Sequence, residues 1–277
     1  MLFHPRQQQR KSTMAQIIRK DIDTYSAVEL AALRKGYAQM QALSDNRGFN
    51  YISGYHGIPN FYCYHLDDPA LFLPWHRAYL LEFEHLLRDR DAALSVPYWN
   101  WASATSHATG VPKAFSDKAA ADQSPNPLYS SQIDVPASNP PVRRRTQRFP
   151  GSPAELPSAA AIDSLVREPS FVRFSRRLRD VHNQIHGWTG GMNATHTVGG
   201  DMGAVATAAF DPIFYSHHCM IDRTWNRWQQ LHGINNIPGA ILHTALKGFN
   251  LTVADVLDTT HLGYSYATAA VLVKEKT

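Results

Sequence analysis

Hydrophobic residues recur at the spacing of an amphipathic helix in four stretches of the chain. This spacing places the apolar side chains on one face, so each stretch predicts a helix that packs against a common core. Several of these faces also carry histidine, a placement that needs a reason. The four sets are Leu30, Leu33, Tyr37 and Met40; His76, Tyr79, Leu80, Phe83 and Leu87; Phe171, Phe174, Leu178, His182 and Ile185; and Ile221, Trp225 and Trp228, in a helix that begins near His217.

The segments between these helices contain little periodic sequence. Residues 102–160 are rich in Ala, Ser, Pro and Asn, which predicts a long, mostly irregular surface loop. Valine, leucine and tyrosine recur in the tail after Pro238 and predict one or two short strands there. We therefore expect a mainly α protein, with an antiparallel four-helix bundle as its core, long loops and a few short strands.

The composition is that of one globular domain. The chain has 277 residues, of which 44% are hydrophobic, enough for one substantial core. We expect a single domain over residues 15–277, preceded by a disordered or extended segment, 1–14. That segment carries Arg6, Arg10 and Lys11 but no apolar run, so it does not read as a secretory signal. No stretch reaches transmembrane length. The chain is expected to be cytoplasmic, with export alongside a partner left open.

Charge and cysteine content narrow the class further. The net charge is only +4, and the densest basic stretch, Arg143–Arg145, lies in a proline-rich region that is typical of a solvated loop. We therefore expect no nucleic-acid partner and no membrane partner. Cys63 and Cys219 are the only cysteines, which excludes a disulfide framework.

Histidine is distributed unevenly along the chain. Nine of the 14 histidines fall within residues 56–85 and 182–218. A single histidine on an apolar face is usually a hydrogen-bonded core residue, but this crowding favours metal binding. Neutral imidazoles without clustered cysteine or carboxylate suit Zn, Cu, Fe or Ni. A zinc hydrolase normally adds a carboxylate or uses one three-histidine site, and a non-haem iron oxygenase uses two histidines and a carboxylate. Six histidines in two groups of three therefore predict a site for two copper ions. A dizinc hydrolase is the alternative.

Helix geometry supports the second group of ligands. His182 and His186 are four residues apart, so both rings reach the same ion from one helix face. The next helix supplies a third ligand, which is either His217 or His218, because both flank its apolar stripe.

The first group includes His76, on the apolar face of its predicted helix. His85 follows nine residues later and is turned by about 180° at 100° per residue, so it is left out. His56 and His65 precede this helix and would complete the triad.

At these residues the chain resembles the tyrosinase, catechol oxidase and molluscan haemocyanin family of type-3 copper proteins, and most of all a short bacterial-type tyrosinase. The first-copper region, Tyr55–Glu84, reads "YHGIPNFYCYH…FLPWHRAYLLEFE". The second, Val181–Trp225, reads "VHNQIHGWTGG…GGDMG…AFDPIFYSHHCMIDRTW". The aromatic segment "VPYWNW" between them carries Asn100 where the family commonly has Asp, and the tail "DTTHLGY" also looks familial.

The resemblance implies a ligand set for each copper ion, with the helical bundle holding the dicopper site. His217 then lies beside the second set without being a ligand. The gap of eleven residues from His65 to His76 is longer than the usual nine, which indicates a small insertion. The implied ligands are His56, His65 and His76 for one ion and His182, His186 and His218 for the other.

Three further residues acquire roles from the resemblance. Cys63 stands two residues before His65, where fungal and molluscan relatives form a thioether to the histidine ring; the alternative is a buried, unmodified cysteine. Asn183 matches the family residue associated with removal of the phenol proton, together with an acid that holds a water. Relatives tend to place this acid as a Glu a few residues before His182, where Asp180 is the candidate here. Gly199, Gly200 and Met202 fall where the family shapes its pocket mouth.

The implied function is a dicopper phenol oxidase that uses O2 as co-substrate to hydroxylate monophenols at the ortho position and to oxidise o-diphenols to o-quinones. Small phenols are the expected substrates, and a homo-oligomer and a copper-delivery protein are left open as partners. One alternative is a catechol or o-aminophenol oxidase without hydroxylation. The other is a haemocyanin-like O2 carrier, in which an additional domain would bury the copper pair.

Overall fold

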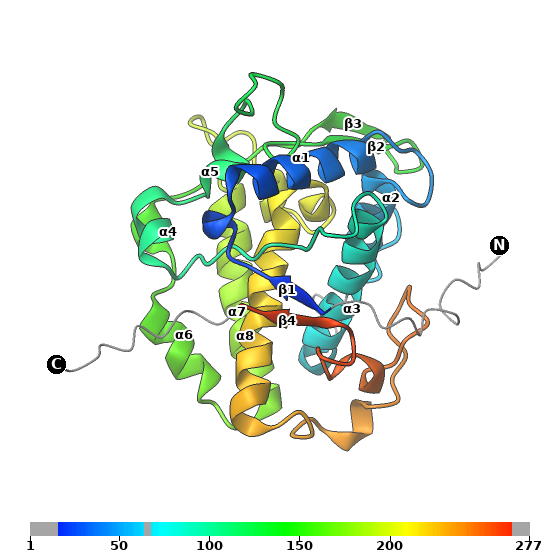
Figure 1. The fold of residues 1–277 in the computed structure, drawn as a ribbon, viewed down its shortest axis with the longest axis vertical. Helices are drawn as coiled ribbons and strands as arrows, with labels where there is room; N and C mark the ends of the chain where they lie inside the picture. Colours follow the sequence, from blue (N-terminus) through cyan, green and yellow to red (C-terminus); the bar gives the residue numbers. More distant parts are fainter. Residues whose placement is uncertain (1–15, 64–67, 268–277) are drawn as a thin grey trace.

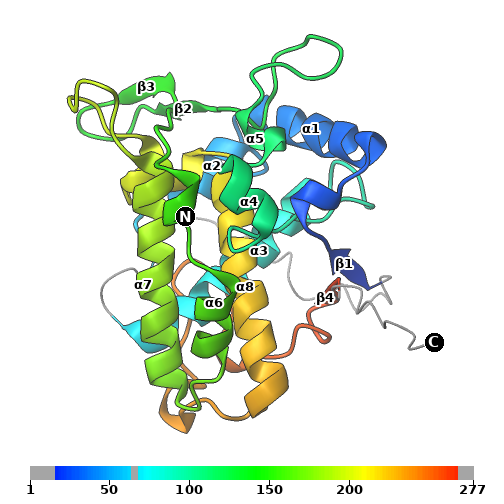
Figure 2. The same ribbon diagram turned by 90° about the vertical axis from the view of Figure 1, so that its left-hand side faces the viewer.

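The computed structural model describes residues 16–63 and 68–267. Three long helices lie side by side at its centre, and shorter helices and two small sheets surround them (Figures 1 and 2). No described helix is long and apolar enough to cross a membrane. The helices are α1 (Ala27–Gln41), α2 (Phe49–His56), α3 (Pro69–Arg88), α4 (Ala104–Thr109), α5 (Lys113–Ser116), α6 (Ala159–Val166), α7 (Phe171–Gly190) and α8 (Ile213–His232).

The directions of the long helices follow from their ring contacts. His76 and Phe83 of α3 lie on His218 and Tyr215 of α8, with ring centroids 4.4 and 3.5 Å apart, so the two helices are antiparallel. Helix α7 is antiparallel to α8 as well, since Phe174 stacks on Trp228 near one end and His186 meets Phe214 near the other. The mainly α bundle predicted from periodicity is confirmed.

Local sequence explains where these helices begin. Asp68 precedes α3, accepts a hydrogen bond from the Ala70 amide at 2.8 Å, and is followed by proline at the first helical position. Ser170 caps α7 in the same way, and Ser26 forms a capping box with Glu29 at the start of α1. Helix α8 begins at Ile213, four residues earlier than predicted, so His217 and His218 lie inside it.

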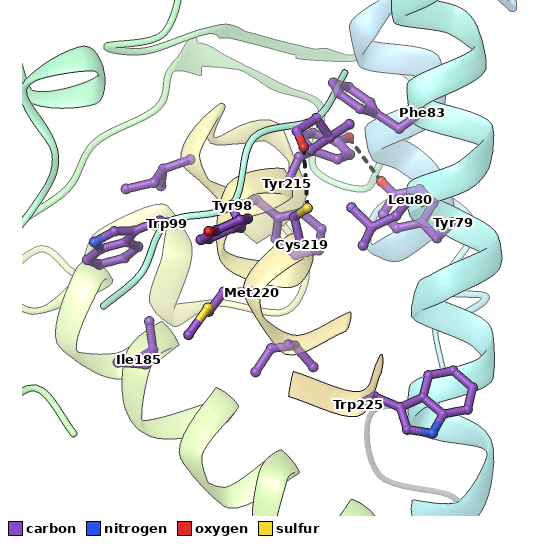
Figure 3. Close-up of a cluster of buried hydrophobic side chains, with 14 of the residues drawn as sticks. Tyr79, Leu80, Phe83, Tyr98, Trp99, Ile185, Tyr215, Cys219, Met220 and Trp225 are labelled. Atoms are coloured by element: carbon purple, nitrogen blue, oxygen red, sulfur yellow. Dashed lines mark hydrogen bonds between the residues drawn. The ribbon is translucent and has the colours of Figure 1, made fainter. Parts of the chain in front are cut away.

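Helix α2 was not predicted from periodicity, and it contacts α1 on the outside of the bundle. It has only eight residues, and the residue before it is Gly48, which has no side chain to cap the helix. Its last residue is His56, so this helix brings one predicted ligand to the core. In the core itself, the hydroxyls of Tyr79 and Tyr215 form a hydrogen bond and the Cys219 thiol donates to a carbonyl (Figure 3).

The region predicted as one irregular loop contains more structure than expected. Besides α4 and α5 it holds an antiparallel pair of strands, β2 (Gln132–Val135) and β3 (Val142–Arg145), with Gln132 opposite Arg145. The basic stretch is therefore a strand and not a loop. The strand predicted in the tail is β4 (Tyr264–Tyr266), which pairs in parallel with β1 (Ile17–Arg19). The predicted segment 1–14 lies outside the described residues.

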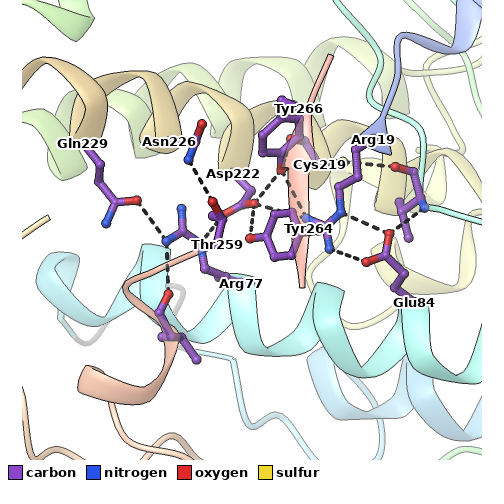
Figure 4. Close-up of polar contacts among 12 residues, drawn as sticks. Arg19, Arg77, Glu84, Cys219, Asp222, Asn226, Gln229, Thr259, Tyr264 and Tyr266 are labelled. Carbon is purple, nitrogen blue, oxygen red and sulfur yellow. Dashed lines mark hydrogen bonds and ion pairs between the residues drawn. The ribbon is translucent and has the colours of Figure 1, made fainter. Parts of the chain in front are cut away.

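Four buried charges connect this small sheet to the bundle (Figure 4). Arg19 of β1 forms a two-pronged ion pair with Glu84 of α3, at 3.1 and 2.9 Å. It also pairs with Asp222 of α8 at 3.2 Å, and Asp222 in turn pairs with Arg77. The Tyr264 hydroxyl donates to Asp222 as well. This network fixes the relative position of α3 and α8, because Arg77 follows His76 directly and Asp222 stands one turn after His218.

Candidate metal centre

Two groups of potential metal ligands lie next to each other in the bundle. One is His182, His186, His217 and His218, and the other is His56, Cys63 and His76; within each group the ligand atoms lie within 4.8 Å of one another. All the histidines in these groups are at most 8% exposed. His65 lies outside the described residues.

Three ring nitrogens converge in the second group. The Nε2 atom of His218 lies 3.2 Å from Nε2 of His182 and 3.3 Å from Nε2 of His186. Two nitrogens bound to one ion by imidazole bonds of about 2.0–2.1 Å at a tetrahedral angle would lie about 3.3 Å apart. The spacing therefore fits three ligands of one ion.

The hydrogen bonds of these rings leave lone pairs facing the centre. His182 Nδ1 donates to the Asn183 side-chain oxygen at 2.9 Å, and His186 Nδ1 donates to the Met202 carbonyl at 2.7 Å. Since a neutral imidazole carries one proton, both Nε2 atoms are acceptors, and His218 can donate to only one of them. Burial lowers the pKa of His218 well below its ordinary value, and the rings of His76 and His182 lower it further. The neutral donor set fits a cation.

His217 occupies a different position. Its ring stacks on His182 with centroids 5.2 Å apart and meets His186 edge-on at 4.8 Å. Neither ring nitrogen has a hydrogen-bond partner among the described residues, and burial lowers its pKa well below the ordinary value. The sequence left His217 and His218 as equal candidates for the third ligand; the nitrogen distances above favour His218.

The first group has the same pattern of orientation. His56 Nδ1 donates to the Val205 carbonyl at 3.2 Å, and His76 Nδ1 donates to the Phe72 carbonyl at 2.8 Å, so both Nε2 atoms can serve as ligands. The Cys63 sulfur lies 3.8 Å from His76 Nε2. The predicted thioether involves His65 and so lies partly outside the described residues; Cys63 and Cys219 form no disulfide.

The histidine rings of the two groups pack against each other. The rings of His76 and His218 are nearly parallel, at 12°, with centroids 4.4 Å apart, and the ring centroids of His76 and His182 are 5.9 Å apart. In each group, two histidines donate through Nδ1 to an oxygen atom: His56 and His76 in the first group, His182 and His186 in the second. The arrangement can therefore hold two ions side by side, each facing the other.

A cavity of about 190 Å³ opens over both groups. It reaches one histidine of each group, and most of the other lining residues are small. An engineered cavity of about 150 Å³ accommodates benzene, so this one has room for a single phenol ring. The lining residues are His56, Asn183, His186, Gly187, Met202, Gly203, Val205 and Ala208.

The remaining predicted residues lie around this cavity. Asn183 lines it, whereas Asp180 is exposed one turn earlier on α7 and is not among the lining residues. Met202 lines it, but Gly199 and Gly200 do not. His85 is exposed on α3, outside both groups.

Sequence reasoning missed the carbonyls that orient the rings. Those of Phe72, Met202 and Val205 carry no side-chain signature, so no pattern in the sequence could have identified them. Gly187, which lines the cavity one turn after Asn183, was also missed. Its position directly after the ligand His186 could have indicated that it lies at the site.

Known proteins are similar to this chain in sequence and in fold. A family model described as the common central domain of tyrosinase matches residues 46–231. The tyrosinase of Streptomyces glaucescens is 32% identical over 227 residues, which cover 68% of this chain and 76% of that protein. Hemocyanin G-type, units Oda to Odg, of Enteroctopus dofleini is 28% identical over 246 residues, 83% of this chain but 8% of that protein. A functional unit of octopus haemocyanin superposes with a TM-score of 0.75 at 27% identity, over 91% of this chain and 68% of that unit.

The chain therefore belongs to the tyrosinase family, as the resemblance implied. This family, which includes the haemocyanins, binds two copper ions, and the two histidine groups fit such a pair. The chain spans only 8% of the length of the octopus haemocyanin that it matches.

Proposed function

We propose that this protein is a dicopper phenol oxidase that uses O2 to hydroxylate monophenols at the ortho position and to oxidise o-diphenols to o-quinones. The observation that supports this most is the cavity, which is large enough for a phenol ring and touches His56 of one group and His186 of the other. A bound copper pair supplies the redox chemistry, exchanging electrons between the phenol and O2. His182 remains a proposed copper ligand, Asn183 and Asp180 remain the candidates for proton handling, and a cytoplasmic location stays part of the proposal.

A haemocyanin-like O2 carrier is the second candidate. The similarity to the octopus haemocyanin supports it. A carrier needs room for O2 only, whereas this cavity has room for an aromatic ring and has glycine at two lining positions, Gly187 and Gly203. O2 uptake by copper-loaded protein, measured with a monophenol, its catechol and an o-aminophenol, distinguishes an oxidase from a carrier, because a carrier turns over none of the three compounds.

Asn183 is the residue on which hydroxylation depends in this proposal. Its side-chain oxygen accepts a hydrogen bond from His182 Nδ1, and Asn183 is one of the residues that line the cavity. The N183A variant should lose monophenol hydroxylation by about tenfold or more relative to catechol oxidation, since assisted proton transfer typically contributes about 10²–10⁴-fold. The ratio of the two rates, with copper content measured alongside, tests this.

Gln184 provides the matched control for Asn183. It is the next residue on α7, is exposed, and donates to the Glu155 carbonyl, away from the cavity. Q184A should keep the wild-type ratio. An unchanged ratio in N183A, or an equal change in Q184A, would contradict a role for Asn183 in hydroxylation. D180N tests in the same assay whether Asp180 is the water-holding acid.

Gly187 sets the width of the cavity in this proposal. A Cβ atom added there meets nothing within 4 Å, so a side chain would project into open space. G187L should bind two copper ions and be at least as stable as wild type, because glycine inside a helix costs about 0.5–1 kcal/mol relative to alanine. The kcat/KM of this variant for 4-substituted catechols should fall about tenfold.

The G187A variant distinguishes filling of the cavity from a change in the helix. It carries the same gain in helix propensity but only one added carbon, so its kcat/KM should stay near the wild-type value. If G187L oxidises bulky catechols as fast as wild type, phenols do not enter through this cavity.

A further inference from the structure

One short segment orients a histidine in each of the two groups. The carbonyl of Met202 accepts from His186 Nδ1 at 2.7 Å, and the carbonyl of Val205, three residues later, accepts from His56 Nδ1 at 3.2 Å. These bonds place the proton on Nδ1 and leave Nε2 for a metal. The position of residues 201–205 therefore affects both ion sites at once.

A single ion pair anchors this segment from outside. Asp201, 2% exposed, accepts two hydrogen bonds from the guanidinium of Arg144 in β3, at 2.7 and 2.6 Å. It also accepts from the Gln147 amide at 2.7 Å, while its own amide donates to the Gln147 carbonyl at 2.8 Å. Paired N–H donors of this kind fix both distance and orientation.

On its other side the segment meets bare backbone. A Cβ atom on Gly190 would lie 2.3 Å from the Gly203 nitrogen, and one on Gly200 would lie 2.3 Å from the Gly190 oxygen. The end of α7 and the segment therefore approach each other without side chains between them. Because glycine-rich backbone is conformationally permissive, contacts outside the segment decide where its carbonyls lie.

The neighbours of Arg144 do not provide this anchor. Arg143 pairs with Asp134 on the exposed side of the hairpin at 2.9 Å, and Arg145 donates to Ser130. Among the described residues, Arg144 forms the one ion pair to Asp201. Arg148 pairs instead with Asp211, at 2.8 Å, ten residues further on.

We propose that the Arg144–Asp201 pair is a positioning device for both copper sites, which holds the carbonyls of Met202 and Val205 where they fix the tautomers of His186 and His56. The β2–β3 hairpin thereby contributes to the metal centre through Arg144. This inference depends on the copper-binding part of the proposed function and not on the oxidation of phenols.

The R144A variant tests this role in two ways. Long-range ¹H–¹⁵N spectra of the copper-free protein should show the Nδ1–H tautomer for His56 and His186 in wild type and its loss at both residues in R144A. Copper affinity, measured against a competing chelator, should fall by about tenfold or more, as is typical when a partner behind a metal ligand is lost. Neither measurement uses a phenol, so copper-loaded protein that oxidises no phenol would contradict the proposed function alone.

R143A is the matched control, because it removes the same side chain from the adjacent strand position. It should keep wild-type tautomers and copper affinity. D201N gives a second route if R144A does not fold: the amide oxygen still accepts from Gln147, but the ion pair is lost, so the same changes are expected. Unchanged tautomers and affinity in folded R144A or D201N would overturn the proposal, as would an equal loss in R143A or a change confined to one of the two histidines.

Discussion

The H218A variant is expected to bind one copper ion per chain instead of two. His218 Nε2 lies 3.2 and 3.3 Å from the nitrogens of His182 and His186, so its removal leaves two ligands at that ion. Oxidation of a catechol should fall by about 10³-fold or more, since a metal ion contributes several kcal/mol to its reaction and about 4 kcal/mol corresponds to this factor. Metal analysis of the purified variant and a catechol assay measure both effects.

H217F is the control that distinguishes the two neighbouring histidines. The His217 ring is buried without a hydrogen-bond partner in the described part of the chain, and an unsatisfied buried donor costs about 1–3 kcal/mol. A phenylalanine ring keeps the packing on His182 and His186, so H217F should retain two copper ions and lose no stability. If H217F loses an ion while H218A keeps both, the assignment of the third ligand is reversed.

Removing the carboxylate of Asp222 should destabilise the protein by about 3–5 kcal/mol, because the buried arginines that face it lose their counter-charge. Arg19 and Arg77 are fully buried and both pair with this group. In D222A the midpoint of thermal unfolding should fall by about 10 °C, at roughly 2–4 °C per kcal/mol for a chain of this size. Copper retention should fall too, since Asp222 and Arg77 lie beside ligand-bearing positions on α8 and α3.

An exposed ion pair on the same helix provides the comparison. Arg227 of α8 pairs with Asp163 of α6 at 2.7 Å, with side chains 35% and 47% exposed. D163A should cost less than about 1 kcal/mol, as surface pairs do. Similar unfolding midpoints for D222A and D163A would show that the buried network does not hold the bundle together.

The same network predicts a dependence on acid. Burial by itself would raise the pKa of Asp222, but the charges of Arg77 and Arg19 outweigh it and lower the pKa below its ordinary value. A carboxylate with a lowered pKa contributes stability above its unfolded-state pKa and loses it as the pH falls through the folded-state pKa. Much of the difference in stability between wild type and D222A should therefore disappear in strong acid.

Periodicity in the sequence predicted what depends on local structure. The apolar stripes of α1, α3, α7 and α8 are visible because each helix buries one face, and rotation of 100° per residue was enough to separate His76 from the exposed His85. The eight residues of α2 are too few for such a pattern, so His56 was identified from its place in the histidine-rich stretch before α3 and from the family resemblance, not from periodicity. The start of α8 was placed near His217, whereas the helix begins at Ile213, because the apolar stripe used to find it starts only at Ile221.

Contacts between distant residues could not be predicted in this way. Arg144 and Asp201 are 57 residues apart, and Arg19 and Asp222 are 203 apart. The basic stretch was interpreted as a solvated loop, and the side chains of Arg143 and Arg144 are 68% and 44% exposed, but nothing in the sequence indicated that Arg144 pairs with the buried Asp201. An exposed arginine that pairs with a buried carboxylate looks the same in the sequence as an unpaired one, so these ion pairs emerge only from the folded chain.

The most direct test of the proposed function is O2 consumption by the copper-loaded protein in the presence of 4-methylcatechol and, separately, 4-methylphenol. The protein should contain two copper ions per chain and consume O2 with both compounds, while the same quinone absorbance appears in each reaction. O2 consumption with the catechol alone would restrict the protein to a catechol oxidase. Reversible O2 binding without turnover of the catechol would contradict the account and identify a carrier.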